Sequence, residues 1–440
     1  MEELVFCYPL GKLNFSDSGN KPSSYRVTDK DKKVLRELAE EKAEIAALPV
    51  HKEKIQMWKK LNSLQKTRPL VWINEIPWHE LDVNDELKNE TSTEFARFLE
   101  TRLRRTIYQW KHMRVDMVVE STLPCYNTIS DSGFEISENV HVSKTDEASD
   151  IYSRGFIEQI KDFRDIEKIK MPIVTYDAKT TEEKFQSMSD IFDGILFVEK
   201  KGMPGFWFAP WDELIRWWGV QHAMYDMVDR PDLVHKVMQR LTDAYLKRLD
   251  QYESLNLLSL NNGNYRIGSG GLSYTDVLPS SSFDQGHVRT RDMWGCGAAQ
   301  IFSGISPQMH YEFALQYEIR WMERFGLNYY GCCEPLDYKI DLLRKIPNLR
   351  KISMSPWVDL DRAAERMGRD FVFSWKPSPA IFMYDAWDVE SIRTKLASDL
   401  QKLENCAVEI IMKDISSVRY KPQNLWEWAK IAVEEAENFG

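Results

Sequence analysis

The chain is poor in cysteine and has no long apolar run, and each absence excludes a class of protein. Six cysteines in 440 residues are too few and too dispersed for a disulfide-stapled fold. The first residues, MEELVFCYPL, show no basic segment followed by an apolar one, so they do not resemble a signal peptide. No run reaches the roughly 18 apolar residues of a membrane-spanning helix. We therefore expect a cytoplasmic protein without a membrane span.

An excess of positive charge is also absent. The formal net charge is −10 and the basic residues form no long stripe, which disfavours nucleic acid as a partner. The composition, 43% hydrophobic and 29% charged, is ordinary for a globular protein. The chain has 15 Trp, 18 Tyr and 20 Phe, which favours aromatic-walled cavities beside an aromatic core. We expect a small-molecule ligand.

Short apolar runs alternate with helical patterns along most of the chain. A helical extension is predicted for residues 1–65, and each of eight later runs is followed by a helical segment. The runs lie in RPLVWIN, RVDMVVEST, GILFVEKK, LNLLSLNN, LNYYGCC, RKISMSPW, DFVFSWK and AVEIIMKD. Repeated strand–helix units predict an α/β fold, a (β/α)8 TIM barrel over residues 66–440. An open doubly wound sheet is the alternative, weakened because no G-x-G-x-x-G follows the first run.

One long segment interrupts this alternation after the fourth run. Residues 263–297 are rich in Gly and Ser but also contain Tyr265, His287 and Arg289. Long irregular segments inside a compact domain usually serve function. We therefore predict a lid-like insertion that binds a ligand.

Polar side chains follow most of the predicted strands at the point where each strand ends. Each one alone is commonly a turn former or a helix cap. In a (β/α)8 barrel, however, the carboxyl ends of the strands form the active site. Because these side chains gather at the carboxyl edge of the predicted sheet, we predict a functional site there. The residues are Asn74, Glu75, Glu120, Ser121, Asn261, Asn262, Cys332, Cys333, Glu334, Ser355, Trp357, Trp375, Lys376, Ser378, Lys413 and Asp414.

Three stretches carry a resemblance to a known family. They are RPLVW with its polar loop, GMPGFWFAPWDELIRWWGVQHAMYDMV, and GCGAAQIFSGISPQMHYEFALQYEIRWM. In this order, over roughly residues 66 to 436, the chain resembles the uroporphyrinogen decarboxylase superfamily. That superfamily includes corrinoid-linked methyltransferases and is related to cobalamin-independent methionine synthase. The resemblance implies a (β/α)8 barrel with an N-terminal helical extension, and a homodimer.

The decarboxylase branch is disfavoured by the residues after the first strand. True uroporphyrinogen decarboxylases carry paired arginines there, because Arg binds a carboxylate through two hydrogen bonds. This chain has VWINEIPWHEL, with Asn74, Glu75 and His79 but no arginine. Glu75 would repel a substrate with many carboxylates.

The methyltransferase branch fits better but not completely. Its members carry His-x-Cys at the end of the fifth strand and a later Cys near the eighth, and zinc held there favours a thiolate. Here Cys333 matches the family cysteine, whereas Gly331 stands where the His should be. The eighth strand ends in Lys413 and Asp414 instead of a cysteine.

Three interpretations of the Cys-Cys-Glu segment remain open. The first is an altered metal site that contains Cys333, Glu334 and an acid or His from another loop, for example Asp414, Glu120 or His287. The second is a metal-free polar site. In the third, the cysteines are small buried hydrophobic residues, as free cysteines usually are. His310, inside a helical pattern, is predicted to be a packing residue.

The resemblance predicts a methyltransferase. It would move a methyl group from a small methylated compound, such as a methoxylated aromatic, to a corrinoid protein. One alternative is a decarboxylase or lyase acting on a smaller carboxylic acid, and another is a binding barrel without catalytic activity. The predicted catalytic residues are Glu75, Asn262, His287, Lys376 and Asp414. The predicted substrate-binding residues are Asn74, Trp207, Tyr265, Arg289 and Trp357. The predicted metal ligands are Cys333 and Glu334.

Overall fold

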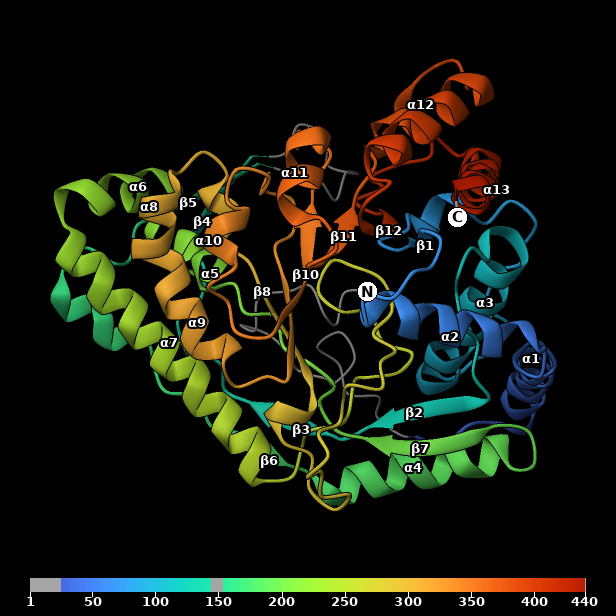
Figure 1. Ribbon diagram of the computed structural model, residues 1–440. Helices are drawn as coiled ribbons and strands as arrows, with labels where there is room; N and C mark the ends of the chain where they lie inside the picture. The colour runs from blue at the N-terminus through green and yellow to red at the C-terminus, as the bar shows by residue number, and fades with distance from the viewer. Residues whose placement is uncertain (1–24, 144–152, 440) are drawn as a thin grey trace.

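A six-stranded parallel sheet is the centre of the computed structural model, which describes residues 25–143 and 153–439 (Figure 1). The first strand of the chain pairs in parallel with the last, so the sheet brings the two ends of the repeat together. This confirms the predicted α/β fold with a parallel sheet. In spatial order the strands are β1 (Leu70–Ile73), β12 (Ala407–Met412), β11 (Val372–Trp375), β10 (Leu349–Met354), β9 (Leu327–Tyr330) and β8 (Trp294–Gly297).

Smaller sheets complete the strand inventory. Strands β2 (Thr122–Tyr126) and β7 (Phe197–Lys201) form a parallel pair. Single parallel bridges, Met203 to Leu258 and Phe208 to Gly297, continue from this pair towards β8. The closed ring of eight strands therefore stays a prediction. Two antiparallel pairs are β3 (Ile129–Asp131) with β6 (Val174–Tyr176), and β4 (Val140–Ser143) with β5 (Ser153–Phe156).

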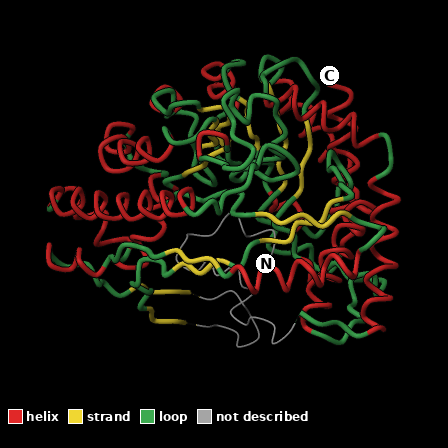
Figure 2. Tube along the Cα trace, turned by 90° about the horizontal axis from the view of Figure 1, so that it is seen from below, coloured by secondary structure: helices red, strands yellow, loops and turns green. Residues whose placement is uncertain are grey.

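Helices flank the strands, and strands and loops occupy the space between them (Figure 2). Side chains cap several of these helices. Thr28 directly precedes α1 and Thr93 directly precedes α3, and each side chain accepts a hydrogen bond from a backbone N–H of the first turn. Within the described residues no helix combines the length and the apolar character needed to cross a membrane. The helices are α1 (Asp29–Ala46), α2 (Val50–Asn62), α3 (Glu94–Met113), α4 (Ala178–Phe192), α5 (Pro210–Trp218), α6 (Val220–Asp229), α7 (Pro231–Ser254), α8 (Pro307–His310), α9 (Gln316–Met322), α10 (Ile340–Leu343), α11 (Leu360–Met367), α12 (Val389–Lys402) and α13 (Pro422–Phe439).

Helices α1 and α2 form within the predicted N-terminal extension, whose boundary stays a prediction. Trp58 of α2 packs in one apolar cluster with Leu70, Val372 and Ala407, the first residues of β1, β11 and β12. Its indole N–H donates to the carbonyl of Asp116. Helix α2 therefore covers the amino edge of the sheet and leaves the carboxyl edge for a site.

The segment 263–297 differs from the predicted lid. Its last residues form β8, which the sequence pattern missed because a Trp-Gly-Cys-Gly strand lacks β-branched residues. Its middle packs inside the curved sheet, where the Gly271 N–H donates to the Glu409 carboxylate. A Cβ at Gly270 would lie 2.5 Å from an oxygen of Glu409. Glycine is therefore needed here because the segment fills the inner face of the sheet.

Candidate functional site

The two adjacent cysteines lie at the carboxyl edge of the sheet, directly after β9. Gly331 ends the strand with a φ of 96°, a conformation that favours glycine. A Cβ there would lie 2.5 Å from the Leu336 side chain. The chain then turns so that the sulfurs of Cys332 and Cys333 lie 3.5 Å apart. Cys332 is buried and Cys333 is half-buried.

Lys413, after β12, places a cation beside both sulfurs. Its Nζ lies 3.6 Å from the Cys332 sulfur and 3.7 Å from the Cys333 sulfur. The same ammonium lies 2.8 Å from Asp414 Oδ2 and 3.3 Å from Glu75 Oε2. Asp414 Oδ2 is also 3.4 Å from the Cys333 sulfur. The predicted residues Glu75, Cys333 and Asp414 are thus brought together.

Backbone geometry supports this convergence. Glu75 and Asp414 have φ values of 52° and 56°, and non-glycine residues in this region cluster at functional sites. The Asp414 N–H donates to Glu75 Oε2 at 3.2 Å, and Arg266 pairs with Glu75 Oε1 at 3.2 Å. The two residues are therefore bonded to each other across the ends of β1 and β12.

The pKa values of the two thiols are shifted in opposite directions. A hydrogen bond from Cys333 lowers the pKa of Cys332, and the Lys413 charge acts in the same direction against the effect of burial. The same hydrogen bond, with burial, raises the pKa of Cys333. Burial acts to raise the pKa of Asp414, but its bonds with Glu75 and Lys413 hold it at about 2. The arrangement favours a Cys332 thiolate, a Cys333 thiol and an ionised Asp414.

Asn74 adds an amide without a partner. It continues β1 beside β12, where its N–H donates to the Met412 carbonyl at 3.0 Å. Its side chain is 2% exposed, and neither amide atom has a hydrogen-bond partner among the described residues. Buried polar groups are normally paired, so this amide is suited to a bound ligand that both donates and accepts.

Lys376 supports the cysteine segment from inside the sheet. Its Nζ donates to Ser353 Oγ at 2.6 Å and to Tyr329 OH at 3.0 Å. Ser353 in turn donates to the Cys332 carbonyl at 2.5 Å. The buried ammonium is thus held by neutral oxygens, with no carboxylate at ion-pair distance among the described residues.

The predicted zinc ligands do not form a set around one point. Glu334 Oε2 accepts the N–H of Cys332 at 2.9 Å, so this oxygen is turned to the backbone. Across the described ranges no three His, Cys, Asp or Glu side chains are arranged to hold a metal ion. The Lys413 ammonium lies where a cation would balance the sulfurs and carboxylates. The residues therefore do not fit the zinc implied by the resemblance, and zinc stays a prediction.

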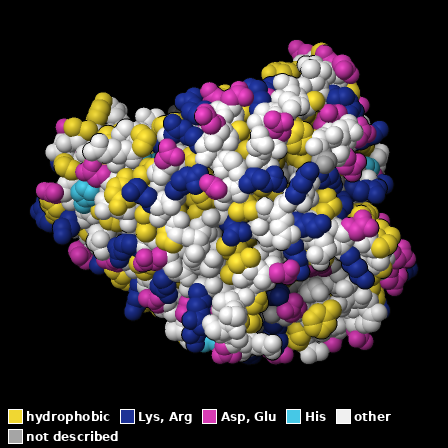
Figure 3. All heavy atoms as spheres, viewed as in Figure 1, with side chains coloured by type: hydrophobic (Ala, Val, Ile, Leu, Met, Phe, Trp, Pro, Cys, Tyr) yellow, Lys and Arg dark blue, Asp and Glu magenta, His cyan; other side chains and the backbone are white. Residues whose placement is uncertain are grey.

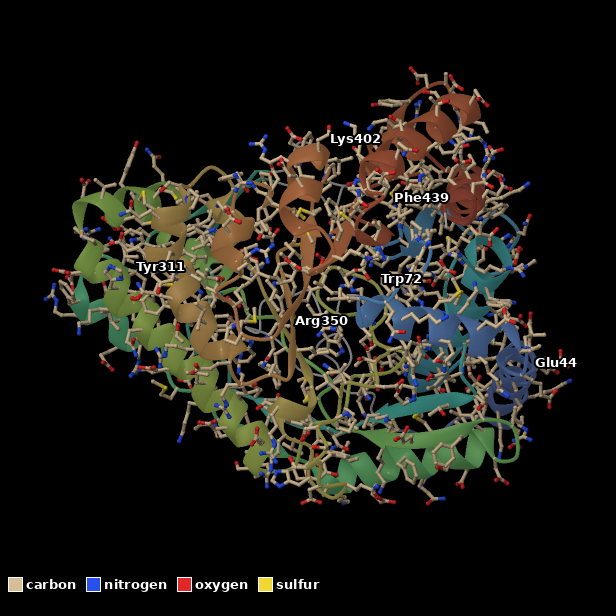
Figure 4. All side chains as sticks on the ribbon, viewed as in Figure 1. Glu44, Trp72, Tyr311, Arg350, Lys402 and Phe439 are labelled. Carbon is tan, nitrogen blue, oxygen red and sulfur yellow. The ribbon has the colours of Figure 1, made fainter. Side chains whose placement is uncertain are left out.

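Three further predicted residues line nearby space. Trp207 is buried in one apolar cluster with Cys332, and Cys333 packs against that cluster. Tyr265 and Asn262 line a cavity of about 550 Å³, and the Asn262 amide also donates to the Leu278 carbonyl at 2.6 Å. This cavity reaches Arg266, the partner of Glu75. It also contains Trp72, which Figure 4 labels, and Tyr126.

A second cavity of about 750 Å³ extends between α11 and α12. Trp357, which is 76% exposed, lines it. Lys402, labelled at the top of Figure 4, lines it as well and pairs with Asp361 across the two helices at 2.8 Å. The predicted substrate-binding residue Trp357 thus belongs to a different cavity from Tyr265.

His287 and Arg289 lie elsewhere. The His287 ring nitrogen Nε2 is 2.7 Å from the Glu253 carbonyl near the end of α7. Arg289 precedes Thr290, whose N–H donates to the Glu253 carboxylate at 3.1 Å. The structure therefore does not bring these two residues to the cysteine pair.

A buried polar cluster behind β9 was not predicted as a group. Tyr330 OH donates to Glu318 Oε2 at 2.7 Å and lies 2.8 Å from His310 Nε2. Burial lowers the pKa of His310 to about 3 and raises that of Glu318 to about 8. His310 is fully buried, in agreement with its predicted packing role. Glu318, which shares the Tyr330 hydroxyl with His310, is eight residues further along the chain, and no spacing pattern in the sequence indicated it.

Sequence reasoning also missed Arg266 and the central position of Lys413. The Lys-Asp pair that ends the eighth run was a usable signal, because both side chains follow a strand. On the surface, basic and acidic side chains are interspersed over the face in Figure 3, without an extended stripe of one sign.

The comparisons with known proteins find little. No family model matches the chain, and no curated protein matches it. One similar solved structure is a methyltransferase from Methanosarcina mazei, with 11% identity, a TM-score of 0.47, and coverage of 88% of this chain and 98% of that chain. This likeness does not assign an activity to the chain.

Proposed function

We propose that the chain is a methyltransferase of the uroporphyrinogen decarboxylase superfamily with a (β/α)8 barrel. It would transfer a methyl group from a small methylated compound to a corrinoid protein. The parallel pairing of β1 with β12 supports the barrel, because a barrel needs its first and last strands to be neighbours. The observation that carries the activity is the sulfur pair beside the Lys413 ammonium.

The chemistry follows from the different protonation of the two sulfurs. The Cys332 thiolate attacks the methyl carbon, so a sulfur–carbon bond forms and the bond from carbon to the leaving heteroatom breaks. The electron pair goes to the heteroatom, which takes the proton of Cys333. Lys413 remains beside the negative charge as it passes from one sulfur to the other.

The cavity of about 550 Å³ is the proposed site for the methyl donor. Its size and its aromatic side chains Trp72, Tyr126 and Tyr265 suit a small ring. A methoxylated aromatic is therefore the proposed donor class.

The acceptor is proposed to dock at the same edge. Trp357, Tyr384 and Tyr420 follow β10, β11 and β12, and they are 76%, 64% and 71% exposed. Exposed aromatic residues are typical anchors of protein interfaces. The corrinoid of such a partner would supply the cobalt that takes the methyl group. A homodimer also remains a proposal.

The test is demethylation of methoxylated aromatics with free corrinoid as acceptor, measured as released phenol. We expect Cys332→Ser to lower the rate by about 10³-fold and Cys333→Ser by about 10²-fold, because one removes the nucleophile and the other the acid. Cys125→Ser is the matched control, since Cys125 lies in a separate apolar cluster. Full activity in both site variants would exclude this mechanism.

Lys376 supports a second candidate, a carboxy-lyase acting on a small carboxylic acid. A buried ammonium held only by neutral oxygens is suited to pair with a substrate carboxylate. Carbon dioxide release from simple aromatic acids, lost in Lys376→Met and retained in Cys332→Ser, would favour this candidate.

A further inference from the structure

We propose that Cys332 and Cys333 are a modification site that low-molecular-weight disulfides oxidise reversibly to a Cys332–Cys333 disulfide. The reaction uses the cysteines and their charged neighbours but no methyl donor. The inference therefore goes beyond the proposed function and does not depend on it.

The geometry brings together what thiol–disulfide exchange needs. The two sulfurs lie 3.5 Å apart, close enough for one to attack a group bound to the other. Lys413 Nζ, within 3.7 Å of both, stabilises a thiolate on either sulfur. Because either sulfur can donate to the other across 3.5 Å, the Cys333 proton can pass to Cys332 and leave the thiolate on Cys333.

Exposure sets the order of the two steps. Cys333 is half-buried, whereas Cys332 is 7% exposed, so a small disulfide meets Cys333 first. The other described cysteines, Cys125, Cys296 and Cys406, are buried. Among the described residues, therefore, only this pair combines an accessible sulfur with a second sulfur within reach.

In the first step the Cys333 proton passes to the Cys332 sulfur, 3.5 Å away, and the Cys333 thiolate attacks one sulfur of the small disulfide. A mixed disulfide forms and one small thiolate leaves. In the second step this small thiolate takes the proton from Cys332, whose thiolate attacks the Cys333 sulfur, and the second small thiolate leaves. The two cysteines lose two electrons and one proton, and the small disulfide is reduced to one thiol and one thiolate, which takes a proton from water.

The neighbouring positions make the product easy to reduce. Consecutive Cα atoms are about 3.8 Å apart, whereas disulfides usually join Cα atoms roughly 4.4–6.8 Å apart. Strained disulfides have high reduction potentials and are the labile ones. The bond would therefore act as a reversible block of the thiolate and not as a structural staple.

The experiment uses the full chain and oxidised glutathione, without methyl donor. After alkylation of free thiols in denaturant, peptide mapping by mass spectrometry reads the state of the peptide that contains both residues. We expect this peptide to lose both of its free thiols, to be lighter by two hydrogens and to carry no glutathione. Dithiothreitol should restore it. Cys125→Ser should behave like the native chain.

Two variants test the order of the steps. Cys332→Ser should retain one glutathione on Cys333, because the second sulfur is absent. Lys413→Met should oxidise about tenfold more slowly, because the thiolates lose their cation. A native chain that keeps both thiols free, or that ends with a stable glutathione adduct on Cys333, would overturn the proposal. Either result would leave the methyl-transfer assay unaffected.

Discussion

Two lysines on the inner face of the same sheet have opposite environments. Lys351 of β10 pairs with Glu409 of β12 at 2.7 Å, and both side chains are fully buried. The remaining partners of this pair are the backbone of Gly271 and Leu272. Both charges of this pair have fixed protein partners, so the pair holds the glycine-rich segment inside the sheet.

Lys413, at the carboxyl edge, is surrounded differently. Its neighbours are two sulfurs and two carboxylates, and the adjacent Asn74 amide lacks a partner. Burial acts to lower the pKa of Lys413, but the charges of Cys332, Glu75 and Asp414 raise it well above its ordinary value, so this ammonium is held by groups that can themselves react. The comparison separates a structural ion pair from a reactive one: the first is complete without a ligand, and the second has groups left for chemistry.

Loss of one charge from the buried Lys351–Glu409 pair should have the greatest effect of the changes considered. Lys351→Met should lower the free energy of unfolding by about 3–5 kcal/mol, because Glu409 would remain buried without its counterion. Urea unfolding followed by circular dichroism measures it. The double variant Lys351→Met with Glu409→Leu should recover most of the loss. A single variant as stable as the native chain would show that the pair does not hold the fold.

Loss of the Lys413 charge beside the two cysteines should have the next greatest effect. Lys413→Met should reduce methyl transfer by about 100-fold, because the thiolate loses its cation. We expect urea unfolding to change much less than for Lys351→Met. Comparable losses of stability in the two variants would contradict the division between structural and reactive lysines.

The metal content of the protein tests whether the site at Lys413 holds zinc. No three ligand side chains of the described residues are arranged to hold a metal ion. Elemental analysis should therefore find no stoichiometric zinc in the native chain or in Lys413→Ala. Stoichiometric zinc in the native chain, lost in Cys333→Ala, would instead establish the zinc site that the resemblance implies.

The pH dependence of the thiols gives a smaller effect. The folded-state pKa of Cys332 lies below its ordinary value, chiefly through the bond from Cys333 and also through Lys413. The thiolate therefore contributes stability above the ordinary thiol pKa, and this contribution is lost as the pH falls through the lowered folded-state pKa. The rate at which iodoacetamide alkylates Cys332, identified by peptide mapping, should rise with a midpoint below that of a free cysteine. In Lys413→Met the midpoint should move to higher pH.

The sequence predicted the parts of the fold that follow from periodic patterns. Apolar runs identified β1, β9, β10, β11 and β12, because buried parallel strands are continuous apolar segments. It missed β8, whose two glycines are required by close packing and not by a strand pattern: a Cβ at Gly295 would lie 2.5 Å from Phe325.

The candidate site was predictable only where chemistry lies at strand ends. Glu75, Cys333 and Asp414 were expected to converge, and their contacts agree with this. Arg266 could not be expected, because it reaches Glu75 from a segment that folds back inside the sheet. His287 comes from the same segment, but its place is set by a hydrogen bond to the end of α7, which no local pattern encodes.

Loss of an exposed aromatic side chain at the carboxyl edge of the sheet should have the least effect. Trp357→Ala should raise the KM for a corrinoid protein by about tenfold, because an exposed aromatic anchor is lost. The rate with free corrinoid should not change, since Trp357 lies outside the cysteine cluster. Tyr225→Ala is the matched control: Tyr225 is 59% exposed on α6, away from the loops that follow β10 to β12. If both variants weaken the partner equally, or neither does, the docking surface is not at this edge. A loss with free corrinoid as well would instead place Trp357 in the reactive site, and the reactive region would then extend from Lys413 into the cavity between α11 and α12.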